Sequence, residues 1–180
     1  QFAIHYFFKN EIVLRTILQN ITDNLKVGGF LIGTCFNGKE LFKKLKGRSK
    51  IEGKTKNGEL LWSITRKYKS RTFPDSKTSL GKEIDVYVRS IGKDHTEYLV
   101  NFDYLTKLLE EYGFTLVKLK SFEDSYQDMI EGNIENNVIN VDKIKEEITD
   151  SEKEFSFLNS SFIFKKMKNT PDSTYSKLLK

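Results

Sequence analysis

Apolar residues recur at helical spacing in two segments of the chain. Residues 10–25 carry one such stripe, and Asn10 can cap the segment because its side-chain oxygen can accept from the free amides of the first turn. Residues 101–112 carry the second stripe, with Asn101 at the capping position and Gly113 directly after the end. The stripes consist of Leu14, Leu18, Ile21 and Leu25, and of Phe102, Leu105, Leu108, Leu109 and Tyr112. The pattern therefore predicts two amphipathic helices.

The other apolar segments are short, which is typical of strands. Residues 27–36 form a continuous apolar run after Gly28 and Gly29, as expected of a strand buried on both faces. Residues 82–91 alternate between apolar and polar positions, which predicts a half-exposed antiparallel strand. Further strands are predicted at residues 59–68, 114–122 and 161–167, helices at 38–47, near 122–131 and at 141–149, and a loop at 47–58.

The order of these elements predicts the fold class. A helix, a buried strand, an antiparallel excursion and then further helices and strands suit an α/β sheet with an insert in its middle. Neither a helix bundle nor a β-sandwich has this order. The segment 169–180 contains Pro171 and little apolar content, so it is expected to be a flexible tail.

Composition narrows the function classes. The chain has 180 residues, enough for one domain with a core, and no run approaches the roughly 18 apolar residues of a membrane helix. A single cysteine, Cys35, excludes an internal disulfide and a Cys-rich metal site. The two histidines are too few for a His-built zinc site, so no metal is expected.

Charge is distributed unevenly. Residues 39–82 hold 14 Lys or Arg against 4 Asp or Glu, a balance of +10, whereas residues 121–156 hold 3 against 11, a balance of −8. The basic segment favours a polyanion such as RNA or DNA as partner. The alternative is a solvated, lysine-rich surface without a partner.

Three motifs carry a resemblance to a known family. They are Gln-Phe-x-x-His-Tyr at residues 1–6, a Gly-Gly strand that ends in Ile-Gly-Thr at 28–34, and Glu-Tyr-Leu-Val at 97–100. In this order and spacing they resemble the mRNA cap guanine-N7 methyltransferases, with the capping enzymes of large DNA viruses as the most similar type. The resemblance covers residues 1–168 and implies the C-terminal half of a class I, Rossmann-like S-adenosylmethionine-dependent methyltransferase sheet. The Gly-rich cofactor loop of the family has no counterpart in these residues.

The resemblance also implies an activity and a set of site residues. The family transfers a methyl group from S-adenosylmethionine to N7 of the cap guanine, a nitrogen with a free lone pair, so no catalytic base is expected. Gln1 and Tyr6 match positions at the cofactor, and Phe2, His5 and Tyr6 match positions around the guanine. His5 would donate to guanine O6, and Glu97 would accept from N1–H and N2–H.

The chain departs from the family pattern at several contacts. Phe36 stands where the family often has a proline of the cap pocket, and Tyr87 is preferred over Val86 as the ring that covers the base. Ser161 or Asn159 lies where the family has a tyrosine. The RNA phosphates are expected to meet the lysines Lys39, Lys43 and Lys44.

Each candidate residue has a structural alternative. Outside these motifs His5 would more often be a hydrogen-bonded core histidine, Glu97 a charge near a helix start, and Phe2 and Tyr6 core aromatics. Two further functions stay open: a non-catalytic, methyltransferase-like RNA-binding or stimulatory module, and a methyltransferase with another acceptor.

The resemblance implies partners and a location as well. The expected partners are capped RNA, the remaining half of the methyltransferase domain, other capping-enzyme domains and an activating subunit, with no membrane. The expected location is the cytoplasm, a virion or viral factory, or the nucleus of a cell.

Overall fold

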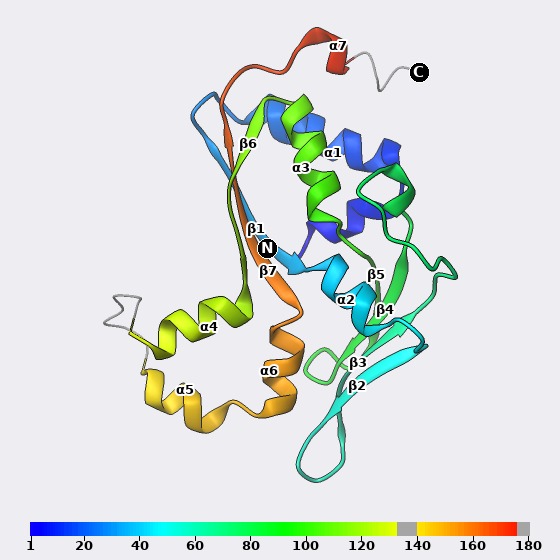
Figure 1. Cartoon of the computed structure of the whole chain (residues 1–180), viewed down its shortest axis with the longest axis vertical. Coiled ribbons are helices and arrows are strands. Elements are labelled where there is room, and N and C mark those ends of the chain that lie inside the picture. Colours follow the sequence, from blue (N-terminus) through cyan, green and yellow to red (C-terminus); the bar gives the residue numbers. More distant parts are fainter. Residues whose placement is uncertain (133–139, 176–180) are drawn as a thin grey trace.

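The computed structural model describes residues 1–132 and 140–175, and Figure 1 shows its ribbon. The strands are β1 (Phe30–Phe36), β2 (Lys50–Lys54), β3 (Leu60–Arg66), β4 (Glu83–Val88), β5 (Asp94–Tyr98), β6 (Phe114–Ser121) and β7 (Asn159–Lys166). The helices are η1 (Ile4–Lys9), α1 (Glu11–Asn24), α2 (Gly38–Lys44), η2 (Lys77–Ser79), α3 (Phe102–Glu111), α4 (Phe122–Ile130), α5 (Val141–Glu147), α6 (Asp150–Ser156) and α7 (Asp172–Tyr175).

The first sheet has the strand order β1-β7-β6, and α1 and α3 cover one of its faces (Figure 1). The apolar stripes of both helices enter a common core with Phe162 and Phe164 of β7. The expectation that β1 is buried on both faces is wrong among the described residues, because Phe30 and Ile32 are 53% and 67% exposed. Alternate side chains of β1 face the helices, and β7 pairs with the strand in the antiparallel sense.

The second sheet has the order β2-β3-β4-β5, and every pair in it is antiparallel. Its inner face packs with Leu41 and Leu45 around α2 in a second core. The N–H of Gly38 donates to the carbonyl of Val100 at 2.9 Å, and a Cβ on Gly38 would lie 2.3 Å from that oxygen. The sheet is the predicted antiparallel insert, but β2 lies in a segment expected to be a loop and β5 was not predicted.

The helix ends follow the predicted capping chemistry. The side chain of Asn10 accepts from the N–H of Val13, and that of Asn101 accepts from the N–H of Tyr104. Gly113 has a φ of +87°, a conformation that favours glycine. Both helices therefore begin at the asparagines that the sequence predicts as caps.

Part of the segment expected to be a flexible tail contacts the domain. Thr170 and Thr174 are 8% and 4% exposed. The hydroxyl of Thr170 donates to the carbonyl of Tyr112, and that of Thr174 donates to the carbonyl of Glu111, each at 3.0 Å. Residues 176–180 of the expected tail lie outside the described residues.

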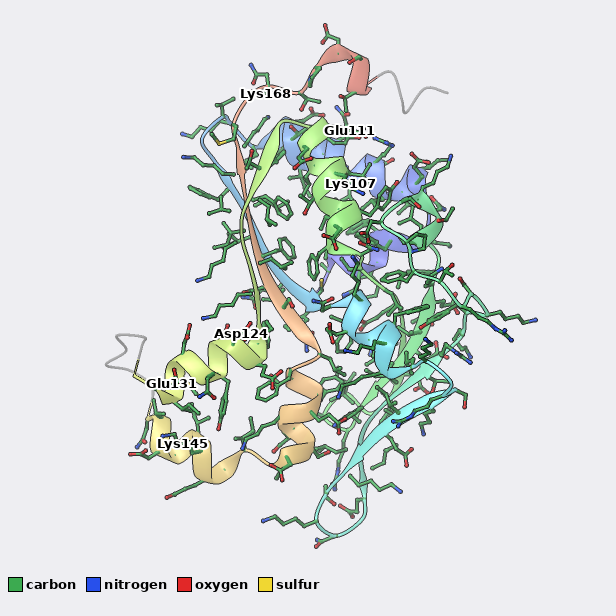
Figure 2. The ribbon with its side chains drawn as sticks, in the orientation of Figure 1. Lys107, Glu111, Asp124, Glu131, Lys145 and Lys168 are labelled. Carbon is green, nitrogen blue, oxygen red and sulfur yellow. The ribbon has the colours of Figure 1, made fainter. Side chains whose placement is uncertain are left out.

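The acidic helices lie at one end of the molecule. Figure 2 places Asp124 on α4, Glu131 directly after that helix and Lys145 on α5, far from Lys107 and Glu111 on α3. The acidic segment is therefore set apart from α3, while its last helix, α6, contacts the basic segment, where Lys44 pairs with Glu154.

Candidate functional site

The principal candidate site is a pocket of about 430 Å³ beside β4 and β5. We call it the His5–Glu97 pocket. Its lining residues are Phe2, His5, Tyr6, Phe36, Val86, Val88, Ile91, His95, Glu97, Phe122, Phe155, Ser156 and Asn159. The walls thus come from η1, the second sheet, α4 and α6, and most of the side chains are apolar with a few polar groups among them, as is usual for small-ligand pockets.

The helix η1 brings His5 into the pocket. The N–H of Phe2 donates to the carbonyl of Thr34 on β1 at 2.8 Å, and the carbonyl of Phe8 accepts from the N–H of Gly81. These bonds fix both ends of η1. His5 is only 3% exposed, and its ring meets the ring of Tyr6 edge-on with 4.2 Å between centroids.

Strand β5 brings Glu97 to the opposite wall. Glu97 pairs with Ile84 and His95 pairs with Val86 across the β4–β5 ladder. Because side chains alternate along a strand, His95 and Glu97 share one face. The N–H of Leu99 donates to the carbonyl of Lys82 at 3.0 Å, which holds the chain in place just after Glu97.

Burial pushes both titratable groups toward their neutral forms. It lowers the pKa of His5 to about 4 and raises the pKa of Glu97 to about 7. The closest approach, between Nε2 of His5 and Oε2 of Glu97, is 3.6 Å. Since His5 is neutral near pH 7, this contact is not an ion pair.

The polar groups of the pocket lack partners. Both ring nitrogens of His5, Nε2 of His95 and Oδ1 of Asn159 are buried without a hydrogen-bond partner among the described residues. Such atoms are rare in folded proteins because an unpaired buried group costs free energy. Several of them in one pocket indicate a polar ligand that supplies the missing donors and acceptors.

Five of the six residues expected around a base are brought together: Phe2, His5, Tyr6, Phe36 and Glu97. The preference for Tyr87 over Val86 is not reproduced, because Val86 lines the pocket and Tyr87 does not. The ladder gives the reason: Val86 pairs with His95, so the next residue of β4 points to the other face.

Gln1 borders a neighbouring cavity of about 200 Å³, and Phe2 lines both cavities. Phe2 has a φ of +49°, an unfavourable conformation for a residue with a Cβ, and is 50% exposed. Thr34 also lines the smaller cavity, and its hydroxyl is buried without a hydrogen-bond partner in the part of the chain that the structure describes. This second cavity therefore also has an unpaired polar atom.

Of the two residues that stood where the family has a tyrosine, Asn159 lines the pocket and Ser161 does not. The hydroxyl of Ser161 donates to the carbonyl of Lys120 instead. His95 was missed by the sequence analysis, although it precedes Glu97 by two positions. That spacing would have revealed it, had residues 94–98 been identified as a strand.

The lysines expected at RNA phosphates lie on α2. Lys39 contacts Asp75 at 2.8 Å and Asp103 at 2.6 Å, and Lys44 contacts Glu154 at 3.0 Å. Lys43 is exposed. Carboxylates thus already compensate two of the three charges, which weakens their attraction for phosphate.

Two classes of site are not found in the described part of the chain. In residues 1–132 and 140–175, no group of three or more His, Cys, Asp or Glu side chains is arranged to hold a metal ion. None of the described helices is both long and apolar enough to cross a membrane.

Comparisons with known proteins agree on one family. The family model of the mRNA (guanine-N(7))-methyltransferase domain matches residues 1–167. The mRNA cap guanine-N(7) methyltransferase of Candida albicans is 33% identical over 135 residues, which cover 72% of this chain and 28% of that protein. The probable mRNA-capping enzyme of Acanthamoeba polyphaga mimivirus is 33% identical over 130 residues, 68% of this chain and 11% of that protein.

A solved structure with lower similarity is an S-adenosylmethionine-dependent methyltransferase from Clostridium acetobutylicum, with a TM-score of 0.45 and 11% identity over 91% of this chain and 54% of that chain. The chain spans between 11% and 28% of the length of the two curated relatives named above. The match of the family model over nearly the whole chain agrees with the α/β architecture and confirms the class I methyltransferase fold expected from the sequence. The chain belongs to the mRNA (guanine-N(7))-methyltransferase domain family.

Proposed function

We propose that this chain is part of an enzyme that transfers a methyl group from S-adenosylmethionine to N7 of the RNA cap guanine. The observation that carries the proposal is the pairing of the buried His5 with the partly buried Glu97, whose side chains approach to 3.6 Å in the His5–Glu97 pocket. Guanine presents an acceptor, O6, next to two donors, N1–H and N2–H. A histidine and a glutamate whose side chains have no hydrogen bond among the described residues complement this edge.

Each residue then has a distinct role. Glu97 accepts from N1–H and N2–H as a carboxylate, and His5 donates to O6 from one ring nitrogen. Phe2, Tyr6 and Phe36 supply apolar and aromatic surface for the base. None of these residues removes a proton, because N7 is already a nucleophile, so the chain acts by positioning.

The charge of Glu97 adds an electrostatic contribution. Methylation turns the neutral guanine into a cation, and a carboxylate beside the ring stabilises that charge more in the product-like transition state than in the substrate. The low polarity of the pocket strengthens the effect. His5, neutral near pH 7, adds no opposing charge.

The smaller cavity fits one side of a cofactor. Gln1, Phe2 and Thr34 border it, and the unpaired hydroxyl of Thr34 is available to a polar ligand. S-adenosylmethionine supplies the activated methyl group when it is bound. Gln1 and Tyr6 hold the cofactor beside the guanine, and Phe2 separates the two cavities.

The proposal includes partners beyond capped RNA. We infer that the rest of the methyltransferase domain adds to the first sheet at β1, which has β7 as its partner among the described strands. The exposed Phe30 and Ile32 also give the face of the first sheet opposite α1 and α3 an apolar surface for that part of the domain to cover. Other capping domains and an activating subunit act with it, in the cytoplasm or a viral factory, or in the nucleus of a cell.

The test is methyl transfer from labelled S-adenosylmethionine to GpppA-capped RNA by the full-length product of the gene. We expect N7 methylation that is lost in Glu97→Ala and His5→Ala variants of unchanged melting temperature. Binding of capped RNA without methyl transfer would favour the stimulatory module instead. Methyl transfer to another position would point to a different acceptor, and either result overturns the proposal.

A further inference from the structure

A second pocket, of about 420 Å³, lies beside the C-terminal end of α2. We call it the Tyr68 pocket. Its lining includes Phe42, Lys46, Arg66, Tyr68 and Arg71. None of the residues assigned above to the base or the cofactor lines it, so it is separate from the His5–Glu97 pocket.

The two pockets nevertheless open on the same face of the second sheet. Arg66 pairs with Ile84, and Ile84 pairs with Glu97. Directly paired residues of antiparallel strands project to the same side. The Cα atoms of Arg66 and Glu97 are therefore two strand spacings apart, roughly 10 Å, a distance that the triphosphate bridge and first nucleotides of a capped RNA can span.

The Tyr68 pocket has an aromatic wall. The ring of Phe42 stacks on Tyr68 at 5.6 Å with 12° between planes and on Phe73 at 5.3 Å with 14°. The hydroxyl of Tyr68 is buried without a hydrogen-bond partner among the described residues. Burial raises the pKa of Tyr68 to about 12, so the hydroxyl is a donor at neutral pH.

The charge of this pocket is strongly positive. Arg66 and Lys82 approach the Tyr68 ring at 5.9 Å and 6.0 Å. No Asp or Glu lines the pocket, and Lys46, Arg66 and Arg71 form no ion pair with a described carboxylate. This distinguishes them from Lys39 and Lys44, whose charges are compensated.

We propose that the Tyr68 pocket binds a nucleotide of the single-stranded RNA that follows the cap. Arg66 and Arg71 hold the two phosphates that flank it, one each, Tyr68 donates to a phosphate or sugar oxygen, and the base lies against the aromatic wall. Arginine suits phosphate because its planar fork donates two parallel hydrogen bonds. Stacking on aromatic rings accepts any base, so the site holds RNA without reading its sequence.

The test compares two ligands on the full-length gene product: a labelled, uncapped six-nucleotide RNA and the dinucleotide GpppA. The pocket variant is the double substitution Arg66→Gln/Arg71→Gln. Its matched control, Lys56→Gln/Lys77→Gln, removes the same charge at exposed lysines of the basic segment outside the pocket. Melting temperatures check that each variant is folded, and Tyr68→Phe tests the hydroxyl alone.

We expect the pocket variant to weaken RNA binding about tenfold and to lower the slope of log K against log salt by about 1.4, for two phosphates. The control stays within about twofold of the wild type, Tyr68→Phe weakens binding about threefold, and GpppA binding is unchanged in all variants. Equal losses in pocket variant and control, or an unchanged slope, overturn the proposal. Competition by polyglutamate as strong as by RNA would assign the pocket to an acidic protein instead.

This inference rests on the proposed function for the identity of the RNA, but the two can fail separately. If the wild type binds the uncapped RNA through Arg66 and Arg71 but does not bind GpppA, the cap assignment fails and the Tyr68 pocket stands. If GpppA binding depends on Glu97 but RNA binding is unchanged by the substitutions of Arg66 and Arg71, the cap assignment stands and the proposal for the Tyr68 pocket fails.

Discussion

The His5–Glu97 pocket and the Tyr68 pocket have nearly the same volume, about 430 Å³ and 420 Å³, and residues of the second sheet line both. The two pockets differ in the charge state of their titratable side chains. In the first, burial moves the pKa values of His5 and Glu97 toward the neutral forms. In the second, Lys46, Arg66 and Arg71 have no carboxylate partner within residues 1–132 and 140–175.

The difference shows how one sheet can supply both selectivity and affinity. Directed hydrogen bonds in a desolvated pocket discriminate one base edge from another, because a mismatched group leaves buried partners unpaired. Uncompensated cations in an open pocket attract any phosphate. Variants in the first pocket should change which ligand is bound, and those in the second should change how tightly any RNA is held.

The largest expected effect is that of Glu97→Gln on GpppA binding. The amide retains the shape but places a donor against a guanine N–H, and it removes a charged acceptor worth about 1.5–3 kcal/mol per hydrogen bond. Affinity should fall about 100-fold or more by calorimetry, while binding of the uncapped RNA stays unchanged. The control is Asp94→Asn, on the opposite face of the same strand. GpppA affinity equal to that of the wild type would contradict the assigned role.

The next effect is a pH dependence confined to the first pocket. The pKa of Glu97 is raised to about 7 in the free protein, so binding through the carboxylate releases a proton near that pH. GpppA affinity should fall by up to about tenfold per unit as the pH drops below 7, and Glu97→Gln should abolish this slope. Calorimetry in buffers of different ionisation enthalpy would detect the released proton, and its absence would contradict the ionisation of Glu97 on binding.

The stability of the protein should also depend on the ionisation of Glu97, and it should fall as the pH rises. A pKa raised on folding, from 4.5 to about 7, gives a contribution that is full below pH 4.5 and is lost as the pH rises through 7. The gain in melting temperature of Glu97→Gln over the wild type should therefore grow between pH 5 and pH 8. Folded His5, with a pKa lowered to about 4, stays neutral over this pH range, so the difference follows the titration of Glu97.

A smaller expected effect is that the two pockets differ in how strongly ligand affinity depends on salt concentration. Raising the salt from 50 to 200 mM should shrink the ratio of RNA affinities between the wild type and Arg66→Gln/Arg71→Gln by about sevenfold, because two phosphate contacts contribute a slope of about 1.4. The ratio between the wild type and Glu97→Gln for GpppA should not change, since it rests on buried hydrogen bonds. A parallel decline of both ratios would remove the distinction between the pockets.

Much of the fold was predictable from local patterns. The helices α1 and α3 have regular apolar stripes and capping asparagines, and β4 alternates cleanly. The strand β5 was missed because Asp94-His95-Thr96-Glu97 has no apolar alternation, and its conformation comes from pairing with β4. The strand β2 was missed for the same reason, since the charged residues around Ile51 resemble a loop.

Site residues within the motifs could be predicted from the sequence. The prediction failed where it depended on which of two neighbouring strand residues faces the pocket. His5 and Glu97 stood in quoted motifs, and the structure brings them together. Tyr87 was preferred over Val86 for its aromatic ring, although strand alternation decides which of two neighbours faces a pocket. Strand alternation also explains why His95 faces the pocket, since it lies two positions from Glu97 on β5. The Tyr68 pocket joins Arg66 and Arg71 to Phe42 and Lys46 of an earlier segment, and only the fold brings these two segments together.

The smallest expected effect tests whether Val86, and not Tyr87, faces the His5–Glu97 pocket. Val86 is 4% exposed and lines the His5–Glu97 pocket, so Val86→Ala should enlarge the pocket and weaken GpppA binding about three- to tenfold. Tyr87→Ala changes the opposite face of β4 and should alter GpppA binding less than twofold. The two neighbours make a matched pair, because both are truncated to alanine on one strand. A larger loss of affinity in Tyr87→Ala than in Val86→Ala would mean that the register of β4 in solution differs from the one that places Val86 opposite His95.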